Sequence, residues 1–378
     1  MYYKNFMGMK LSALGMGGMR FPCKDGNDAM PDQEKVNRLI DECLESGINY
    51  FDTGWGYHGG NSEKVLGEAL RRHQRDTYYI ASKFPGYFQK YFGKVEQVFE
   101  EQLCRCGLGY FDFYLLHNVW ENNVEDYLNE KEHGTISYLK EQKRRGRIRH
   151  LGMSTHGKVE TVERFLKEYG EEIEFVQIQL NWFDYEYQNA KGMLDLLKVY
   201  EKPVFVMEPL RGGRLCSLER VYLEKLARLQ PEWDEVEWAF RFLQSIPEVT
   251  MVLSGMSNLE QVRRNCELYQ NEQRLKVQDF NALDEIAKEM AEGWGIPCTA
   301  CRYCIKECPK GIEIPEVLGK YTEYMNSIGA FSKEAEFRGL KANSCIGCKR
   351  CEGVCPQKIN ISALMKKIKE SMEKRDAE

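Results

Sequence analysis

The sequence has no long apolar run, and this absence limits where the protein can reside. No stretch of the 378 residues approaches the roughly 18 consecutive apolar residues that a membrane-spanning helix needs. The N-terminal segment MYYKNFMGMKLSALGMGG also lacks the apolar core that follows a basic start in a secretory signal peptide. We therefore expect a cytoplasmic protein with no membrane partner.

An excess of charge of either sign is missing as well. The 53 lysines and arginines nearly balance the 58 aspartates and glutamates, giving a formal net charge of −5. Nucleic-acid-binding domains are usually strongly basic, so this composition argues against a nucleic-acid partner. Because 43% of the residues are hydrophobic, the chain can form a sizeable core, which excludes global disorder.

Cysteine, in contrast, is abundant. In a reducing compartment the 14 cysteines argue against a disulfide framework and indicate metal or redox chemistry. Eight of them fall in two similar units, residues 298–309 (CTACRYCIKECP) and 345–356 (CIGCKRCEGVCP). The other six are scattered, and we expect them to be small buried side chains: Cys23, Cys43, Cys104, Cys106, Cys216 and Cys266.

Each unit has the spacing C-x2-C-x2-C-x3-C-P of bacterial-type ferredoxins with two 4Fe–4S clusters. In that arrangement three thiolates of one unit bind one cluster, and the fourth cysteine binds the cluster of the other unit. The predicted ligand sets are Cys298, Cys301, Cys304 and Cys355 for one cluster, and Cys345, Cys348, Cys351 and Cys308 for the other. Zinc is the alternative, but structural zinc sites use two separated pairs of cysteines, and neither unit has that form.

Short β-rich runs alternate with amphipathic segments along the first 255 residues. The predicted strands are Leu11–Met16, Ile48–Asp52, Tyr78–Lys83, Phe111–His117, Ile148–Ser154, Phe175–Leu180, Pro203–Glu208 and Thr250–Ser254. The predicted helices include Asp32–Ser46, Ser62–Arg72, Val95–Cys106, Gly157–Tyr169, Ala190–Tyr200 and Leu259–Tyr269. Eight such units predict an α/β fold, a (β/α)8 TIM barrel. A doubly wound sheet is the alternative, but residues 14–18 (LGMGG) lack the full G-x-G-x-x-G spacing.

We expect the barrel to occupy residues 1–285 and a small ferredoxin-like domain to occupy residues 286–378. In that second domain, helices are predicted over Glu316–Ile328 and Ile361–Lys374, the latter as a terminal helix.

Polar residues stand at the carboxyl ends of three predicted strands, where barrel enzymes place their chemistry. These are Asp52, Lys83 and His117, and Tyr57 follows Asp52 by five residues. A phenol is a weak acid, but a nearby ammonium stabilises the phenolate and lowers its pKa, while a carboxylate holds the ammonium in place. An imidazole can orient a carbonyl oxygen. Together the four residues predict a proton-transfer site.

Seven motifs follow one another in order along the chain: FDTGWGYHGGNSEKVLGEAL (51–70), IASKF (80–84), FDFYLLHN (111–118), IRHLGMST (148–155), VQIQLN (176–181), MEPLRGGRL (207–215) and LSGMSNLEQVRRN (253–265). With these motifs the sequence resembles the aldo-keto reductase superfamily over about residues 10–270. The resemblance implies that Asp52, Tyr57, Lys83 and His117 form the catalytic tetrad, with Tyr57 as the general acid.

The same resemblance implies a nicotinamide cofactor, NADP or NAD. Ser154 and Gln177 would hold the carboxamide of the nicotinamide. The pyrophosphate and adenosine would be held after the last strand by Gly255, Ser257, Asn258, Gln261 and Asn265. Ser257 and Asn258 also fit a purely structural role, capping the helix that follows them.

The sequence departs from the family's pattern at three places. Thr155 stands where the family usually has Asn, and Met207 and Glu208 replace the usual Tyr-Ser, so the aromatic that stacks on the nicotinamide is absent. Gln261 occupies a position that often holds a basic residue contacting the 2′-phosphate. The choice between NADP and NAD is therefore left open.

Clusters transfer single electrons, whereas a nicotinamide transfers a hydride, and a standard carbonyl reduction needs no cluster. We expect an oxidoreductase that interconverts a carbonyl and an alcohol, or acts on a related small organic substrate. Its clusters would connect the site with a one-electron partner, a ferredoxin or a flavoprotein, and a flavin cofactor is left open. Two alternatives are a structural, oxygen-sensing or regulatory role for the clusters, and an electron-transfer adaptor whose barrel is not a nicotinamide-dependent enzyme.

Aromatic residues in three predicted loops suggest an apolar or aromatic substrate, unless they simply cover the barrel mouth: Tyr87, Phe88, Tyr91, Phe92, Trp120, Trp182 and Phe183.

Overall fold

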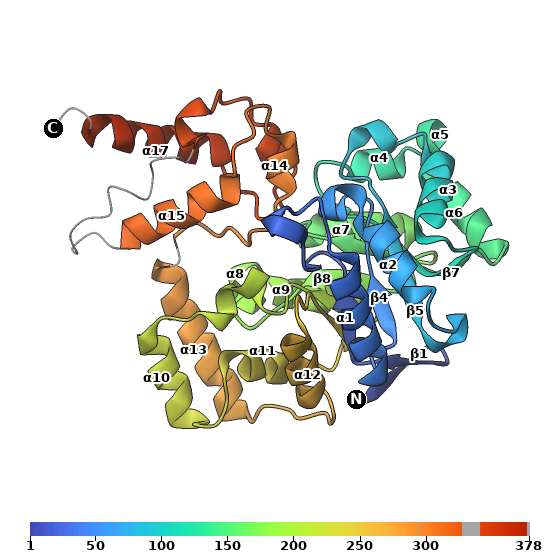
Figure 1. Cartoon of the computed structure of the whole chain (residues 1–378), viewed down its shortest axis with the longest axis horizontal. Coiled ribbons are helices and arrows are strands. Elements are labelled where there is room, and N and C mark those ends of the chain that lie inside the picture. Colours follow the sequence, from blue (N-terminus) through green and yellow to red (C-terminus); the bar gives the residue numbers. More distant parts are fainter. Residues whose placement is uncertain (294, 327–340, 376–378) are drawn as a thin grey trace.

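Eight parallel strands form a closed barrel in the computed structural model, which describes residues 1–293, 295–326 and 341–375 (Figure 1). The strands are β3 (Leu14–Gly17), β4 (Tyr50–Asp52), β5 (Tyr79–Phe84), β6 (Phe111–Leu116), β7 (Ile148–Thr155), β8 (Val176–Gln179), β9 (Val204–Met207) and β10 (Val249–Ser254). They pair in chain order, and β10 closes the ring against β3. The predicted (β/α)8 TIM barrel is confirmed.

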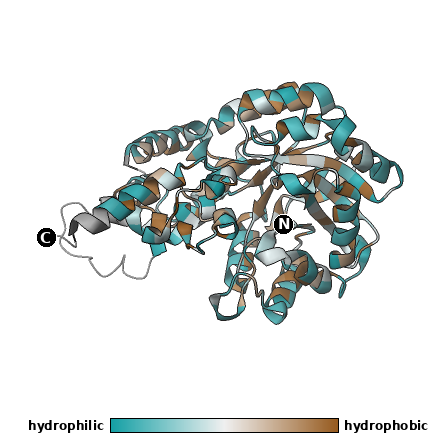
Figure 2. Cartoon of the chain, turned by 90° about the horizontal axis from the view of Figure 1, so that it is seen from above, coloured by the Kyte–Doolittle hydropathy of each residue, from teal (hydrophilic) through white to brown (hydrophobic). Residues whose placement is uncertain are grey.

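Helices surround the barrel, with apolar residues concentrated on the strands inside the ring (Figure 2). The helices of this part are α1 (Gln33–Glu45), α2 (Ser62–Leu70), α3 (Val95–Cys106), α4 (Val124–Leu128), α5 (Glu130–His133), α6 (Thr135–Arg144), α7 (Val159–Tyr169), α8 (Asp184–Tyr187), α9 (Ala190–Val199), α10 (Arg220–Leu229), α11 (Glu235–Gln244), α12 (Leu259–Leu268) and α13 (Val277–Gly293). Helix α1 illustrates the local rules: the Asp32 side chain accepts a hydrogen bond from the Lys35 amide, which caps the helix. Its buried residues, among them Val36 and Ile40, recur at helical spacing and face the barrel core.

An antiparallel hairpin of β1 (Tyr3–Phe6) and β2 (Met9–Ser12) precedes the barrel. Phe6 packs among barrel side chains, with its ring 5.5 Å from that of Phe113 and 5.6 Å from that of Phe205. The hairpin therefore fills one end of the barrel and leaves the chemistry to the other. The single strand predicted over Leu11–Met16 is wrong, because β2 ends at Ser12 and β3 begins at Leu14, in different sheets.

The C-terminal module, described over residues 295–326 and 341–375, has a small apolar core of its own. Its helices are α14 (Tyr303–Glu307), α15 (Ile314–Asn326), α16 (Arg350–Gly353) and α17 (Ile361–Arg375), with a short 3-10 helix η6 (Lys341–Ser344). Helices α15 and α17 match the two predicted helices, except that residues 327 and 328 lie outside the described residues. Helix α13 spans the expected domain boundary at 285/286, and its buried residues up to Met290 belong to the barrel core.

The module lies against the barrel end at which the strands terminate. Arg214 donates to the carbonyl of Ile296 at 2.8 Å, and Gln357 donates to Gln179 Oε1 at 2.8 Å. Gly212 adopts φ +70°, and a Cβ there would lie 2.1 Å from the carbonyl oxygen of Thr299. Only glycine permits this approach of the two backbones. The module therefore covers the end of the barrel at which the strands terminate.

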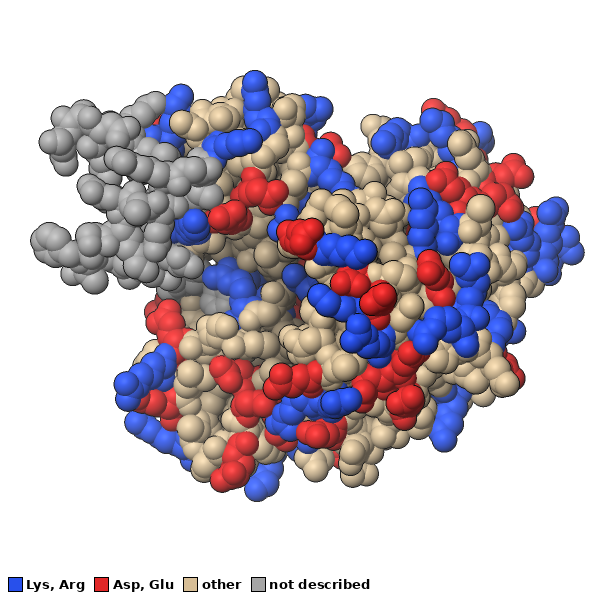
Figure 3. Space-filling view, viewed as in Figure 1, with Lys and Arg blue, Asp and Glu red and all other residues tan. Residues whose placement is uncertain are grey.

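Acidic and basic side chains are intermixed over the face of the molecule shown in Figure 3, in keeping with the balanced charge of the sequence. None of the described helices combines the length and the apolar character needed to cross a membrane.

Candidate active site and iron–sulfur sites

The four residues predicted to transfer protons meet at the covered end of the barrel. Asp52 ends β4, Lys83 lies near the end of β5, His117 directly follows β6, and Tyr57 begins a 3-10 turn, η2 (Tyr57–Gly60). All four are buried, with exposed fractions between 0% for Lys83 and 8% for Tyr57. Parallel strands place their carboxyl ends at one rim, which is why residues so far apart in sequence come together. We call these four residues the tetrad.

Lys83 is the centre of the hydrogen bonding in the tetrad. Its Nζ donates to Asp52 Oδ1, to the carbonyl of Thr53 at 2.7 Å and to the Tyr57 hydroxyl at 3.4 Å. Burial lowers the pKa of Lys83, but Asp52 and Tyr57 together outweigh it and hold the pKa above its ordinary value. Burial likewise raises the pKa of Asp52, against the effect of Lys83. The two residues form a buried ion pair aimed at the phenol.

Tyr57 and His117 complete the tetrad. Burial raises the pKa of Tyr57 above its ordinary value, and the opposing Lys83 charge does not overcome it. The predicted lowering is therefore wrong in its net direction, although a protonated phenol is the form that a general acid requires. Burial and the charge of Lys83 lower the pKa of His117 well below its ordinary value. The imidazole is accordingly neutral, so one of its ring nitrogens donates a hydrogen bond and the other accepts one.

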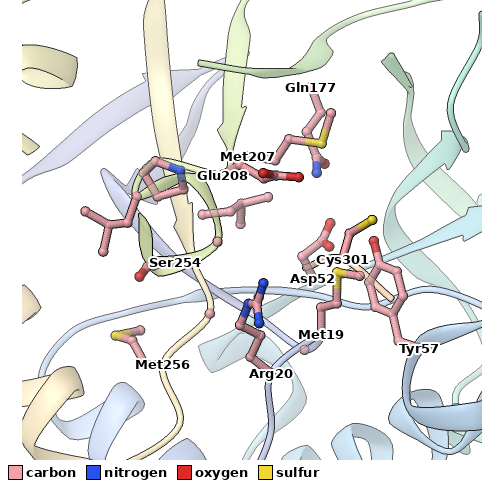
Figure 4. Close-up of a pocket in the computed structure, with 18 of the residues that line it drawn as sticks. Met19, Arg20, Asp52, Tyr57, Gln177, Met207, Glu208, Ser254, Met256 and Cys301 are labelled. Atoms are coloured by element: carbon pink, nitrogen blue, oxygen red, sulfur yellow. The ribbon is translucent and has the colours of Figure 1, made fainter. Parts of the chain in front are cut away.

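A cavity of about 460 Å³ opens in front of the tetrad (Figure 4), and we call it the acid–base cavity. Of the residues predicted to hold a nicotinamide cofactor, six line this cavity: Ser154, Gln177, Gly255, Ser257, Gln261 and Asn265. Among the described atoms, Gln177 Oε1 is buried and has no hydrogen-bond partner, as expected of an acceptor kept for a ligand. Asn258 does not line the cavity; its side chain accepts from the Gln261 amide at 2.9 Å and caps α12.

Two further polar residues of this cavity were not assigned a role from the sequence. Glu208 has φ +55° and is held by Thr299, whose hydroxyl donates to Glu208 Oε1 at 3.3 Å. Its other oxygen, Oε2, is buried and has no partner among the described atoms, and burial together with Asp184 raises the pKa of Glu208 to about 7. Arg20 lies across the cavity, and its backbone carbonyl accepts from the Ser257 hydroxyl at 2.7 Å.

The eight cysteines of the two units surround two small cavities inside the C-terminal module. The first, here the proximal cysteine cavity, is lined by Cys298, Cys301, Cys304 and Cys355. The second, the distal cysteine cavity, is lined by Cys308, Cys345, Cys348 and Cys351. Each cavity thus receives three cysteines from one unit and one from the other, as in the predicted ligand sets.

The two cysteine sets do not form the compact group that a single zinc ion needs. Four thiolates bound to one zinc ion lie only about 3.8 Å from one another, given Zn–S bonds of about 2.3 Å in a tetrahedron. Among the described residues, the three metal-type ligand atoms that do gather within 4.8 Å belong to Cys23, Asp28 and His58, and no three cysteines do so. This arrangement fits one zinc ion poorly, whereas a cluster takes one thiolate on each of its iron atoms.

The proximal cysteine cavity adjoins the acid–base cavity. Cys301 lines both of them, so one cysteine of the first unit faces the space in front of Tyr57 (Figure 4). Tyr303, two residues further along, also lines the acid–base cavity. Neither role could be predicted from the sequence, because the contact joins two parts of the chain that fold around separate cores.

Of the loop aromatics predicted to form the substrate pocket, Tyr87 lines the acid–base cavity. Trp120, Trp182 and Phe183 are buried and do not line this cavity, and the last two belong to the barrel core. The prediction of an apolar or aromatic substrate therefore keeps only part of its support.

Known proteins match both parts of the chain. The Aldo/keto reductase family matches residues 13–288, and the 4Fe-4S dicluster domain matches residues 297–360. The NADH-specific methylglyoxal reductase of Escherichia coli is 27% identical over 299 residues, which cover 67% of this chain and 87% of that protein.

Two solved structures share the fold. The aldo-keto reductase AKR11C1 from Bacillus halodurans has a TM-score of 0.61 and 24% identity, and the match covers 76% of this chain and 96% of that one. An aldo-keto reductase from Klebsiella pneumoniae, solved with NADPH, has a TM-score of 0.60 and 18% identity, with coverage of 76% and 96%. The chain therefore belongs to the aldo/keto reductase family of oxidoreductases and carries a 4Fe–4S dicluster domain after its barrel.

Proposed function

We propose that the protein interconverts a carbonyl and an alcohol with NADP(H) or NAD(H), and that two 4Fe–4S clusters connect its site with a one-electron partner. The observation that carries this proposal is the position of Cys301, which lines both the acid–base cavity and the proximal cysteine cavity. A cluster held there would be separated from the reacting groups by little more than one side chain.

The acid–base cavity suits a nicotinamide cofactor. Gln177 Oε1 is an unpartnered acceptor for a carboxamide, and the N-terminus of α12 with the nearby Arg20 offers positive potential for phosphates. The methylglyoxal reductase of Escherichia coli is NADH-specific and the Klebsiella protein was solved with NADPH, so relatives use both forms. When bound, the nicotinamide would supply or accept the hydride.

The tetrad would handle the proton. In the reducing direction, the Tyr57 hydroxyl donates a proton to the carbonyl oxygen as the hydride reaches the carbon, and the reverse happens in oxidation. Lys83, held charged by Asp52, stabilises the phenolate that Tyr57 leaves behind. Neutral His117 directs the carbonyl oxygen toward the phenol through a hydrogen bond.

We propose that the cysteines lining the proximal and distal cavities hold one 4Fe–4S cluster each. The distal set is nearer to solvent: Cys348 is exposed, and so are the neighbouring Lys310, Lys349 and Arg350. This basic surface fits an acidic one-electron partner such as a ferredoxin or a flavoprotein. Electrons would then pass from the distal cluster to the proximal cluster and on to the acid–base cavity.

An electron-transfer adaptor with an inactive barrel remains the second candidate, as does a purely regulatory role for the clusters. The adaptor is disfavoured by the intact tetrad, since a barrel without chemistry would have no need of the buried Lys83–Asp52 pair.

The proposal is tested on anaerobically purified protein by optical and electron paramagnetic resonance spectra, with NADPH, NADH and dithionite added in turn. Reduction of the clusters by either nicotinamide would support communication between the two parts, and a further flavin analysis would identify any mediator. Reduction by dithionite alone, with oxidation of NADPH by added aldehydes that depends on Tyr57, would favour regulatory clusters. If the protein binds no dinucleotide and Tyr57→Phe changes nothing, the barrel is not the proposed enzyme.

A further inference from the structure

The hydroxyl of Tyr303 reaches the tetrad although this residue belongs to the C-terminal module. Its oxygen is 3.5 Å from Nε2 of His117, and Tyr303 lines the acid–base cavity together with Tyr57. The ring of Tyr303 is partly buried and lies 5.6 Å from the ring of Tyr87, which lines the same cavity. The phenol thus contacts His117 and shares the cavity with Tyr57.

The first cysteine unit holds Tyr303 in this place. The residue stands between Cys301 and Cys304, and Arg302 before it adopts φ +67°, a left-handed turn that starts α14. Lys306 lies three residues after Tyr303 in α14. Its ammonium donates to the carbonyl of Gly56, the residue immediately before Tyr57. The loop is therefore attached to the barrel next to the general acid itself, and its position does not depend on Tyr303 alone.

The contacts of the Tyr303 hydroxyl are those that the proposed reaction requires of the substrate oxygen. That oxygen must accept the hydrogen bond of Tyr57 and lie within reach of His117 Nε2. Two oxygen atoms cannot approach each other closer than about 2.5 Å even when they share a hydrogen bond, so one position between the two groups admits one oxygen. In this structure the Tyr303 hydroxyl lies within reach of His117 Nε2 in the cavity that Tyr57 also lines, where the substrate oxygen would have to lie.

We propose that Tyr303 is a specificity-determining residue that occupies the oxygen-binding position of the acid–base site and excludes simple carbonyl compounds from it. The inference rests on the proposed function, since it assumes that Tyr57 is the acid. A substrate reacts only when its own contacts with the cavity are strong enough to displace Tyr303. Small aldehydes, which make few such contacts, are therefore poor substrates of the intact protein, and the cluster-bearing module selects what the barrel reduces.

The experiment uses the anaerobically purified holoprotein and compares Tyr303→Phe and Tyr303→Ala with the unaltered chain. Tyr321→Phe is the matched control, because it removes a phenol hydroxyl from the same module at a residue packed on the module core. Turnover is measured with 4-nitrobenzaldehyde and NADPH, and binding of the unreactive pair 4-nitrobenzyl alcohol and NADPH is measured by calorimetry. Iron content and the optical spectrum show whether each variant retains its clusters.

We expect kcat/KM for the aldehyde to rise by about tenfold in both Tyr303 variants, the effect of removing one competing hydrogen bond, and the alcohol to bind more tightly by a similar factor. Tyr321→Phe should change neither quantity. A rise in either Tyr303 variant that keeps its iron supports the proposal. Unchanged or lower kcat/KM together with unchanged alcohol affinity in both variants overturns it.

The proposed function can fail separately. In the Tyr303→Ala background, Tyr57→Phe should abolish the gained turnover. If the gain persists without the Tyr57 hydroxyl, the assignment of Tyr57 as the acid is wrong, whereas tighter binding of the alcohol would still show that Tyr303 had blocked the site.

Discussion

Replacing Lys83 by methionine should leave the Asp52 carboxylate buried without its partner. Lys83 is 0% exposed and Asp52 is 3% exposed, and the ammonium makes all three of its hydrogen bonds inside the barrel. Removing one member of a buried ion pair typically costs about 3–5 kcal/mol, because the remaining charge is neither solvated nor paired. We expect the free energy of unfolding of Lys83→Met to fall by that amount at pH 8.

The loss should depend on pH in a definite direction. A lone buried carboxyl takes up a proton to avoid its charge, so the loss of Lys83 raises the pKa of Asp52 further above its ordinary value. Because the folded variant then binds a proton more tightly than the unfolded chain, its deficit is smallest below the unfolded pKa, near pH 4. The deficit grows as the pH rises through the range between the unfolded and the folded pKa, and it is complete above the folded pKa.

The measurement is urea unfolding of the anaerobic holoprotein between pH 5 and pH 8, followed by tryptophan fluorescence, to which the buried Trp238 of the barrel contributes. The double variant Asp52→Asn/Lys83→Met should recover most of the loss, because no charge is left buried. Lys167→Met is the control, because its pair with Glu163 is exposed and contributes little to stability. A deficit below about 1 kcal/mol, or one independent of pH and not recovered in the double variant, would show that Asp52 and Lys83 do not form the buried pair described here.

Two further predictions concern the cavities on either side of Cys301. If Cys308 and Cys345 bind the same cluster, the double variant Cys308→Ser/Cys345→Ser should lose about half of the iron. The double variant Cys298→Ser/Cys308→Ser removes one ligand from each cluster and should lose nearly all of it. The control Cys104→Ser changes an exposed cysteine outside both sets and should lose no iron. Equal iron in the two double variants would contradict the grouping. Because burial raises the pKa of Glu208 to about 7, well above its unfolded value, this residue lowers stability as the pH rises from about 5 to 7. Glu208→Gln should therefore gain stability over the unaltered chain by up to about 3 kcal/mol at pH 8 and by little at pH 5, and a difference that does not change with pH would refute this.

Much of the barrel could be predicted because parallel strands buried on both faces read as short apolar runs, and capped amphipathic helices follow them. The tetrad followed from the fold, since Asp52, Lys83 and His117 stand at matching ends of neighbouring strands. The N-terminal hairpin could not be read in the same way. Leu11 and Leu14 look like one strand, yet the chain turns at Ala13 so that Phe6 can fill the barrel end.

Only part of the candidate nicotinamide site could be predicted from the sequence. Ser257 and Gln261, from the motif after the last strand, line the cavity, while the side chain of Asn258 caps the helix that follows it. Sequence alone showed that the stacking aromatic is replaced by Met207 and Glu208. The burial and the unpartnered oxygen of Glu208 depend on the module packed above it, and therefore appear only in three dimensions.

The cysteine units were settled by local spacing, because the residues that wrap a cluster lie within a dozen positions of one another and need no distant contact to be recognised. The meeting of His117 with Tyr303, 186 residues further along the chain, was decided by tertiary structure alone. Two separately cored parts meet there through polar contacts and the close approach at Gly212. Such a junction leaves no periodic pattern and no motif in the sequence, because it depends on how the folded surfaces of the two parts fit together.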